Sequence, residues 1–371
     1  MLINQQGEDF TVKKTAIIVA AVLFFSTAGA AGYLSIPFTI SKNNQFHKQL
    51  NQSDYDSQNT MNRLTEIMDK NEADSLFIME GQNVLAEYGE SDQISNVASV
   101  RKSLISALFG IAESKGLINV DQTLEELGID DTKNPLSEKE KQATVEDLLK
   151  ARSGIYITSL GESKDMKEKR PERGTYSHNE HYYYNNWDFN TLGVIFEQET
   201  GTSLGEAFYE WIAKPTEMKK FQPSNVVYQE SEETSMPMYR FYMCAEDLAR
   251  FGSLYANDGK WRDKQIIPEN WIDASFEAYS EITDVDRFTG YGYLWWLEKQ
   301  KDQMLQWAVG AGGQYVVVDR ESKISLAMMN NTGTSPLGVF WYRTFDGGEE
   351  PYSDVRDVFE LAKNSIMKRQ K

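Results

Sequence analysis

The chain contains 371 residues, enough for one large domain or two of average size with a substantial hydrophobic core. Its 56 acidic and 38 basic side chains give a formal net charge of -18 at pH 7, which repels phosphate backbones, so nucleic acid is not an expected partner. Cys244 is the only cysteine and there are three histidines, which excludes an intramolecular disulfide and argues against a metal site built on these residues.

The N-terminal region has the pattern of a membrane anchor or an export signal. Lys13 and Lys14 precede an uncharged stretch, residues 15–38, that is long enough to cross a bilayer, and this order predicts a cytoplasmic N-terminus. A signal peptide is the alternative, because Ala28-Gly29-Ala30 fits a small-residue cleavage pattern. The apolar character continues to Phe38, which favours an uncleaved anchor.

Both interpretations export the rest of the chain. We expect a protein anchored in the bacterial inner membrane and facing the periplasm, or one that is periplasmic or secreted after signal cleavage. The predicted organisation is a cytoplasmic N-terminus (1–14), an anchor or signal peptide (15–38), a polar spacer (39–60) and a folded domain (61–371).

The first predicted elements of the folded part are a hairpin and a long helix. Residues 75–79 and 84–88 are strand-like runs separated by Glu80-Gly81-Gln82-Asn83, a turn signal. From Val100 the apolar residues recur at the spacing of one helical face, and Gly116 ends the predicted helix.

The rest of the chain alternates between helical and strand-like regions. Residues 120–240 hold further predicted helices, and strand character returns near the C-terminus. Strands at both ends that enclose helices indicate an α+β fold: one antiparallel sheet flanked by helices, with an inserted, mostly helical lobe. The predicted helices are 145–151, 189–198 and 355–368, the predicted strands are 291–297, 314–319 and 324–329, the sheet part comprises 61–98 and 240–371, and the helical part comprises 99–239.

Ser99 and Lys102 stand three positions apart at the start of the predicted helix, so the lysine can reach the hydroxyl on the same face. A serine hydroxyl is a poor nucleophile until a base removes its proton, and the first turn of a helix favours the resulting alkoxide. Lys102 serves as that base only if burial or neighbouring cations lower its pKa. The spacing alone also fits a helix cap beside a solvated lysine, so the remaining motifs have to decide.

Further motifs follow this pair in a fixed order. A segment at 143–149 comes before Tyr184-Asn185-Asn186, and Gly310-Ala311-Gly312-Gly313 comes last. With the serine-lysine pair, these motifs resemble the serine β-lactamase and penicillin-binding-protein superfamily, in its class C β-lactamase branch, and most of all the group related to 6-aminohexanoate-dimer hydrolase. The resemblance runs from about Asp74 to about Asn331 and implies the β-lactamase-like fold.

The resemblance assigns roles to the second motif. Tyr184 would share proton transfer with Lys102, and a neighbouring ammonium ion would lower the pKa of its phenol. Asn186 would position the lysine and the substrate carbonyl.

The third motif departs from the family pattern. It usually carries a lysine or histidine, but the segment from Gly310 to Gly313 has neither, which argues against β-lactamase activity. Glycines still permit close backbone approach, so the backbone NH groups of Gly313 and Ser99, with Gly312 beside them, would form the oxyanion hole.

Two features near the second motif have simpler interpretations. His178 and His181 lie in a polar loop, a setting typical of solvated histidines, so a Ser-His-Asp triad is not expected. Residues 162–173 form a densely charged loop, for which a solvated excursion is the default and a lid the alternative.

The sequence therefore predicts a serine hydrolase that cleaves an amide or ester bond of a small molecule through an acyl-enzyme on Ser99. Lys102 and Tyr184 would act as general base, and no metal, other cofactor or protein partner is predicted. A D-amino-acid peptidase or weak β-lactamase acting on cell-wall material is one alternative. A noncatalytic, tethered binding or sensor module is another, against which the complete set of Ser99, Lys102 and Tyr184 argues.

Overall fold

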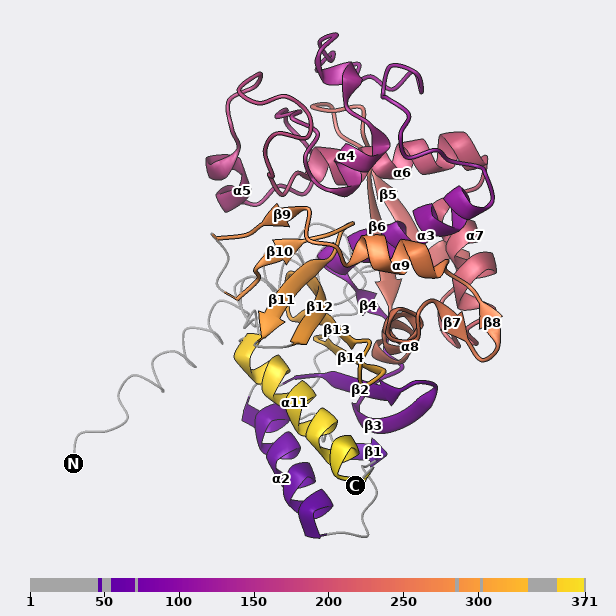
Figure 1. Cartoon of the computed structure of the whole chain (residues 1–371), viewed down its shortest axis with the longest axis vertical. Helices are drawn as coiled ribbons and strands as arrows, with labels where there is room; N and C mark the ends of the chain where they lie inside the picture. The colour runs from indigo at the N-terminus through magenta and orange to yellow at the C-terminus, as the bar shows by residue number, and fades with distance from the viewer. Residues whose placement is uncertain are drawn as a thin grey trace, which may run out of the picture. The chain divides into compact units, whose positions relative to one another are not determined.

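A sheet whose strands come from both ends of the sequence organises the described part of the chain. The computed structural model describes residues 46–48, 55–70, 73–283, 287–300, 303–332 and 352–369. Nine antiparallel strands lie in the order β1-β3-β2-β14-β13-β12-β11-β10-β9 (Figure 1). In chain order these strands are β1 (Phe46–Lys48), β2 (Ser75–Glu80), β3 (Asn83–Gly89), β9 (Ser280–Glu281), β10 (Gly290–Tyr291), β11 (Trp296–Gln300), β12 (Gln303–Gly310), β13 (Gln314–Asp319) and β14 (Ile324–Met329).

The centre of the sheet joins the early strands to the late ones. β2 pairs with β14 along its whole length, from Ser75 opposite Met329 to Glu80 opposite Ile324. Each strand of this pair also belongs to a hairpin: β2 pairs with β3, and β14 pairs with β13. The four strands that the hydrophobic pattern predicts at these places, and their antiparallel arrangement, are confirmed.

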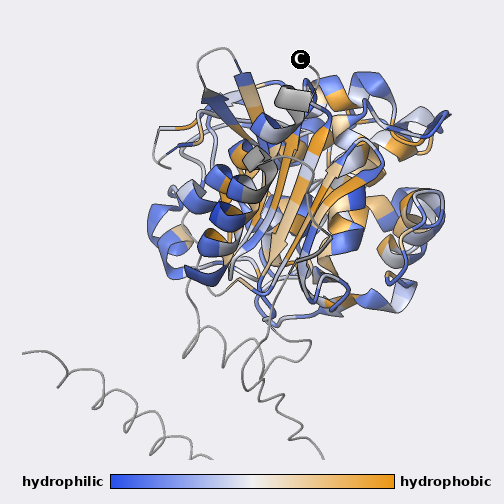
Figure 2. Cartoon of the chain, turned by 90° about the horizontal axis from the view of Figure 1, so that it is seen from below, coloured by the Kyte–Doolittle hydropathy of each residue, from blue (hydrophilic) through white to orange (hydrophobic). Residues whose placement is uncertain are grey.

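Both faces of the central strands are covered. Val316 and Val318 of β13 belong to the hydrophobic layer that contains α3 (Arg101–Ser114) and α8 (Ala245–Ala256). Tyr315 and Val317 belong to the opposite layer, with α2 (Tyr55–Lys70) and α11 (Tyr352–Arg369). Alternate residues therefore face alternate layers, as a pleated strand requires. Figure 2 shows the result, with hydrophobic strands lying between helices that are hydrophilic on the outside.

The inserted region is mostly helical, as predicted, but a small sheet that the sequence did not reveal lies where this region joins the sheet part. This second sheet has the order β4-β6-β5, and its strands are short. The remaining elements are β4 (Ser95–Asn96), β5 (Val226–Gln229), β6 (Met238–Met243), β7 (Lys260–Trp261), β8 (Lys264–Gln265), α4 (Val145–Leu149), α5 (Lys164–Lys169), α6 (Asn186–Thr200), α7 (Leu204–Phe208), α9 (Glu269–Ser275), the 3-10 turns η1 (Ala98–Val100), η2 (Glu140–Gln142) and η4 (Pro223–Asn225), and the π-helical turn η3 (Tyr209–Ala213).

One predicted strand is divided in two. The aromatic run at 291–297 bends between β10 and β11, where Leu294 has a positive φ of 64°. A Cβ at Gly292 would lie 2.0 Å from the carbonyl oxygen of Ser275, so the backbone passes too close for any other residue. The run's hydrophobicity predicts burial correctly, but this turn interrupts it.

The N-terminal predictions meet the structure only in part. Residues 1–14 and 15–38, the expected cytoplasmic segment and anchor, lie outside the described residues. Among the helices of the described part, none combines the length and apolarity that a bilayer crossing requires. The expected polar spacer at 39–60 contains β1, which pairs with β3, and the start of α2. A three-residue strand is too short to leave a periodic signal in the sequence.

Asp131 joins three segments of the inserted region. This fully buried carboxylate accepts hydrogen bonds from Trp187 Nε1 at 3.1 Å and Thr234 Oγ1 at 2.6 Å. The backbone NH groups of Lys133 and Ser235 donate to it at 3.0 Å each. Burial by itself raises the pKa of Asp131, but these hydrogen bonds outweigh it and lower the pKa below its ordinary value.

We predict that Asp131→Asn destabilises the protein by about 2–3 kcal/mol, because at least one buried donor loses its charged acceptor. The lowered pKa means that Asp131 contributes stability above its unfolded pKa of about 3.9, and that this contribution disappears as the pH falls through the folded pKa. The difference between variant and wild type in urea unfolding should therefore shrink from pH 7 to pH 3. Asp263→Asn, at an exposed position, is the control and should change little; an equally stable Asp131→Asn would contradict the prediction.

Candidate active site

A tight turn holds Ser99 at the head of the central helix. Ser99 lies in η1, directly before α3, and is partly exposed. Ala98 has a positive φ of 48°, and its NH donates to Asn96 Oδ1 at 2.8 Å. The NH of Val97 donates to the carbonyl of Phe241 at 3.1 Å. These bonds over-determine a strained turn, which is how a fold presents one reactive side chain to solvent.

Lys102 lies one helical turn further along, with its Nζ 2.7 Å from Ser99 Oγ. The side chain is only 2% exposed. Its Nζ lies 4.6 Å from the ring centre of Tyr184 and 4.9 Å from that of Phe189. Burial, and secondarily the charge of Arg101, lowers the pKa of Lys102 well below its ordinary value. A neutral amine within hydrogen-bond distance of a hydroxyl can accept its proton.

Tyr184 is the third member of this group, beside Ser99 and Lys102. It directly precedes the N-cap of α6, and its ring stacks on Trp296 at 5.2 Å and packs against Phe189 at 4.9 Å. Burial raises the pKa of Tyr184 to about 12, although a hydrogen bond with Ser99 and the charge of Arg101 act in the opposite direction. The expectation of a lowered pKa is therefore wrong, because desolvation outweighs the neighbouring cation. At neutral pH Tyr184 is a proton donor.

The two asparagines of the second motif have different surroundings. Asn185 caps α6 through its Oδ1, which accepts from the NH of Trp187, and donates to Asp188 Oδ1 at 2.8 Å. Asn186 is 3% exposed, and its Nδ2 lies 3.9 Å from Met166 Sδ. Its Oδ1 is buried and has no partner, so no hydrogen bond links it to Lys102. Asn186 thus holds an available acceptor beside the predicted catalytic residues.

The third motif lies directly against the nucleophile turn, the segment from Val97 to the predicted nucleophile Ser99. Gly310 ends β12 opposite Gln314, and the turn between them has positive φ values of 87° at Gly312 and 76° at Gly313. A Cβ at Gly310 would lie 2.4 Å from the carbonyl oxygen of Val97 and 3.1 Å from the backbone nitrogen of Ser99. No side chain fits there, which gives a physical reason for the missing lysine or histidine.

The charged loop is anchored more firmly than its composition indicates. The side chain of Glu162 is fully buried and pairs with Arg170 at 3.0 Å. The hydroxyl of Tyr183 donates to the carbonyl of Met166 at 2.8 Å. Together with the contact between Met166 and Asn186, this brings α5 onto the second motif. The residues of α5 are not buried, as a solvated excursion predicts, but Glu162 and Met166 tie the loop to the rest of the inserted region.

The histidines form no triad. His178 Nδ1 lies 2.9 Å from Asp147 Oδ2, and Asp147 also caps α4 through Thr144. His181 stacks on the ring of Tyr176 at 4.3 Å. Within the described residues no serine forms a hydrogen bond with His178, so the Asp-His pair orders the loop before Tyr184.

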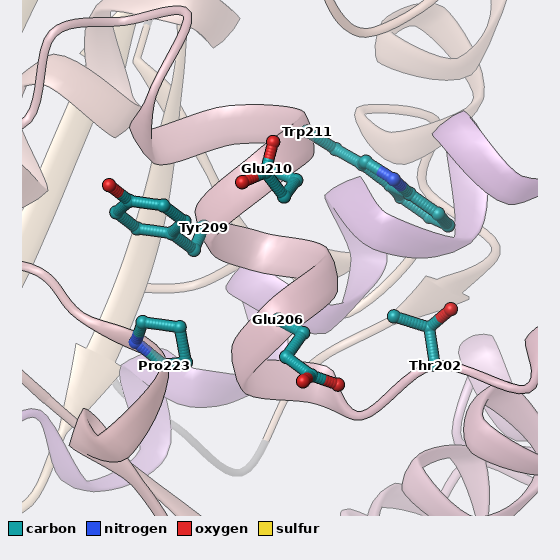
Figure 3. A pocket seen from close by; sticks show the side chains of 6 residues that line it. All are labelled: Thr202, Glu206, Tyr209, Glu210, Trp211 and Pro223. Atoms are coloured by element: carbon teal, nitrogen blue, oxygen red, sulfur yellow. The ribbon is translucent and has the colours of Figure 1, made fainter.

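A pocket of about 450 Å³ lies elsewhere, around the π-helical turn η3 (Figure 3). Its lining side chains come from α7, from η3 and from the neighbouring segments that carry Thr202 and Pro223, and none of them belongs to the group around Ser99. No cluster of three or more His, Cys, Asp or Glu in the described segments is arranged to hold a metal ion. The residues lining the pocket are Thr202, Glu206, Tyr209, Glu210, Trp211 and Pro223.

Comparison with known proteins agrees with this architecture. The family model described as Beta-lactamase matches residues 76–343. An uncharacterized protein of Alkalihalophilus pseudofirmus is 23% identical over 253 residues, which is 60% of this chain and 70% of the relative.

Three solved structures share the fold. The "Putative 6-aminohexanoate-dimer hydrolase from Bacillus anthracis" has a TM-score of 0.59 and 18% identity, with 82% of each chain covered. A structure named as a putative beta-lactamase, from Bacteroides dorei, has a TM-score of 0.60 and 16% identity over 81% of this chain and 97% of that one. The octameric penicillin-binding protein homologue of Pyrococcus abyssi has a TM-score of 0.53 and 18% identity over 79% and 78%.

We predict that Gly310→Ala displaces the end of β12 from the nucleophile turn and slows the reaction of Ser99 with a serine-directed probe by at least about tenfold, the effect of roughly 1.4 kcal/mol. The labelling rate is the measurement. Gly116→Ala is the control, because its Cβ would meet nothing within 4 Å; its φ of 66° adds backbone strain that Gly310 lacks, so the control tests steric contact and not strain. Equal labelling rates for the two variants would show that the close contact at Gly310 does not matter.

Proposed function

The chain belongs to the Beta-lactamase family, whose model spans most of it, and from this premise we propose a serine hydrolase that cleaves an amide or ester bond through an acyl-enzyme on Ser99. One observation carries the proposal: the buried Lys102 amine lies 2.7 Å from the Ser99 hydroxyl, and its pKa is lowered mainly by burial. The fold and the family support a hydrolase in general, and the site geometry supports the mechanism.

In the first stage, the neutral amine of Lys102 takes the proton of Ser99 while Oγ attacks the carbonyl carbon. The negative charge passes to the carbonyl oxygen, which the backbone NH groups of Ser99 and Gly313 would stabilise. The Tyr184 phenol, with its pKa near 12, suits the donor that protonates the leaving nitrogen or oxygen. The Lys102 ammonium then returns a proton to the phenolate.

In the second stage, water attacks the acyl-enzyme. Lys102 again accepts a proton, this time from the water, and Ser99 leaves with a proton back on its Oγ. Asn186 Oδ1, buried and without a partner, would accept a hydrogen bond from a substrate amide.

The surroundings of the site favour an uncharged substrate. Gly310 leaves no room for the cation with which the third motif usually binds a substrate carboxylate. Tyr184, Trp296 and Tyr291 pack together as an aromatic wall. The name of the hydrolase-like structural neighbour is in keeping with an amide substrate. We therefore place small amides and esters ahead of cell-wall peptides and β-lactams, and propose from residues 15–38 that the domain acts outside the cytoplasm.

The nucleophile and base are tested by labelling with a fluorophosphonate probe. We expect Ser99→Ala to abolish labelling and Lys102→Met to slow it roughly 10²–10⁴-fold, the usual contribution of a general base. Because Lys102 must be neutral to act, wild-type labelling should rise with pH through its lowered pKa and disappear at acidic pH. Ser114→Ala, at the far end of α3, is the control and should label normally. Absence of labelling in folded wild-type protein would favour a noncatalytic binding module.

Substrate class is tested with two chromogenic compounds. We expect turnover of p-nitrophenyl acetate and none of a chromogenic cephalosporin, because Gly310 offers no cation for the carboxylate of the cephalosporin. Initial rates at matched concentrations give the comparison. Comparable rates on both compounds would favour the β-lactamase alternative.

A further inference from the structure

Arg101 is a buried cation without a counterion. Its side chain is 4% exposed, Nη2 donates to the neutral amide of Asn190 at 2.9 Å, and Nη1 has no hydrogen-bond partner. Its guanidinium carbon lies 4.2 Å from the ring centre of Tyr239. In the described part of the chain, no carboxylate lies within ion-pair distance of it. Burying an unpaired charge costs several kcal/mol, so a fold retains one only where the charge has a use.

The neighbouring residue supplies the use. Lys102 follows Arg101 in α3 and is also buried, so two residues that are neighbours in the sequence would both carry a positive charge in a desolvated setting. A guanidinium cannot give up its proton under these conditions, whereas an amine can. The strain between the two charges is therefore relieved at Lys102.

Within the described residues, no other ionisable group forms an ion pair with Arg101 or Lys102. Tyr184 precedes α6 and Tyr239 lies on β6, and burial raises the pKa of both phenols. Asp188, in the first turn of α6, is bonded to Ser153 and Asn185, and burial raises its pKa well above its ordinary value. Its hydrogen-bond partners, Ser153 and Asn185, are other residues, so in the described part of the chain no ion pair screens the charge of Arg101.

We propose that Arg101 is a positioning residue for the base: its permanent charge keeps Lys102 in the neutral form. This inference rests on the proposed function, because it concerns the base of that reaction. Burial lowers the pKa of Lys102 and the charge of Arg101 lowers it further, which supports this role. Arg101 also acts on Tyr184, the second proton carrier of the site.

The test titrates Lys102 directly in the full-length chain, so that it does not depend on turnover. Lysine labelled with ¹³C at Cε is followed by NMR from pH 5 to pH 11, and Lys102→Met identifies the signal. We expect Arg101→Met to raise the titration midpoint of Lys102 by at least about one pH unit. Arg101→Gln, which still donates to Asn190, should do the same if the methionine variant folds poorly.

Ester hydrolysis adds a second readout. In Arg101→Met and Arg101→Gln the acidic limb of kcat/KM should move upward with the midpoint, so a midpoint that is one pH unit higher lowers kcat/KM about tenfold at pH values below the limb. Activity should return at alkaline pH. An unchanged Lys102 midpoint, with or without a lower melting temperature, would assign Arg101 a purely structural role and overturn the inference. A raised midpoint in a protein that hydrolyses no ester would instead count against the proposed function alone.

Discussion

The contact between the Lys102 amine and the Ser99 hydroxyl is the constraint on which the rest of the structure depends. An amine reaches neutrality at ordinary pH only when water is kept from it. Residues Arg101 through Ala112 of α3 are buried between the sheet and the inserted helices, and this burial lowers the pKa of Lys102. The nine-stranded sheet, the helical region and the aromatic rings around Tyr184 all contribute to keeping water from the Lys102 amine.

The distribution of charge follows from the same constraint. Two buried carboxylates of the described residues are paired with groups other than Ser99, Lys102 and Tyr184. Asp131 accepts hydrogen bonds from several segments of the inserted region. Glu162 pairs with Arg170. A carboxylate beside Lys102 would stabilise its ammonium form and stop the reaction. Asp188, on α6, is hydrogen-bonded to Ser153 and Asn185 instead, and burial raises its pKa.

The sequence predicts those parts of the site that depend on local spacing and motif order. Ser99 and Lys102 face each other because they are one helical turn apart, and the hairpins at β2–β3 and β13–β14 follow from alternation and turn residues. The sequence locates the third motif, but only the structure identifies Gly310 as the residue in contact with the nucleophile turn. That closeness is a backbone-to-backbone distance, which no residue pattern encodes.

Properties that depend on burial were beyond sequence reasoning. An arginine at the start of an amphipathic helix has the pattern of a solvated residue, and Arg101 is buried because β6 and α6 close over it. The raised pKa of Tyr184 has the same origin, since the rings that desolvate it include Trp296, which is far along the chain. Likewise, the composition of the charged loop does not reveal that Met166 contacts Asn186 or that the side chain of Glu162 is buried.

The pairing of β2 with β14 also governs how the molecule can be made. The hydroxyl of Ser75 donates to the carbonyl of Met329, which lies 254 residues further along the chain. β2 therefore cannot pair with β14 until almost the entire polypeptide has been synthesised. Contacts of such long range fold slowly and leave hydrophobic edges unpaired in the growing chain. During synthesis this protein therefore stays without its central sheet until the last strands emerge, and chaperones have a long interval in which to hold it.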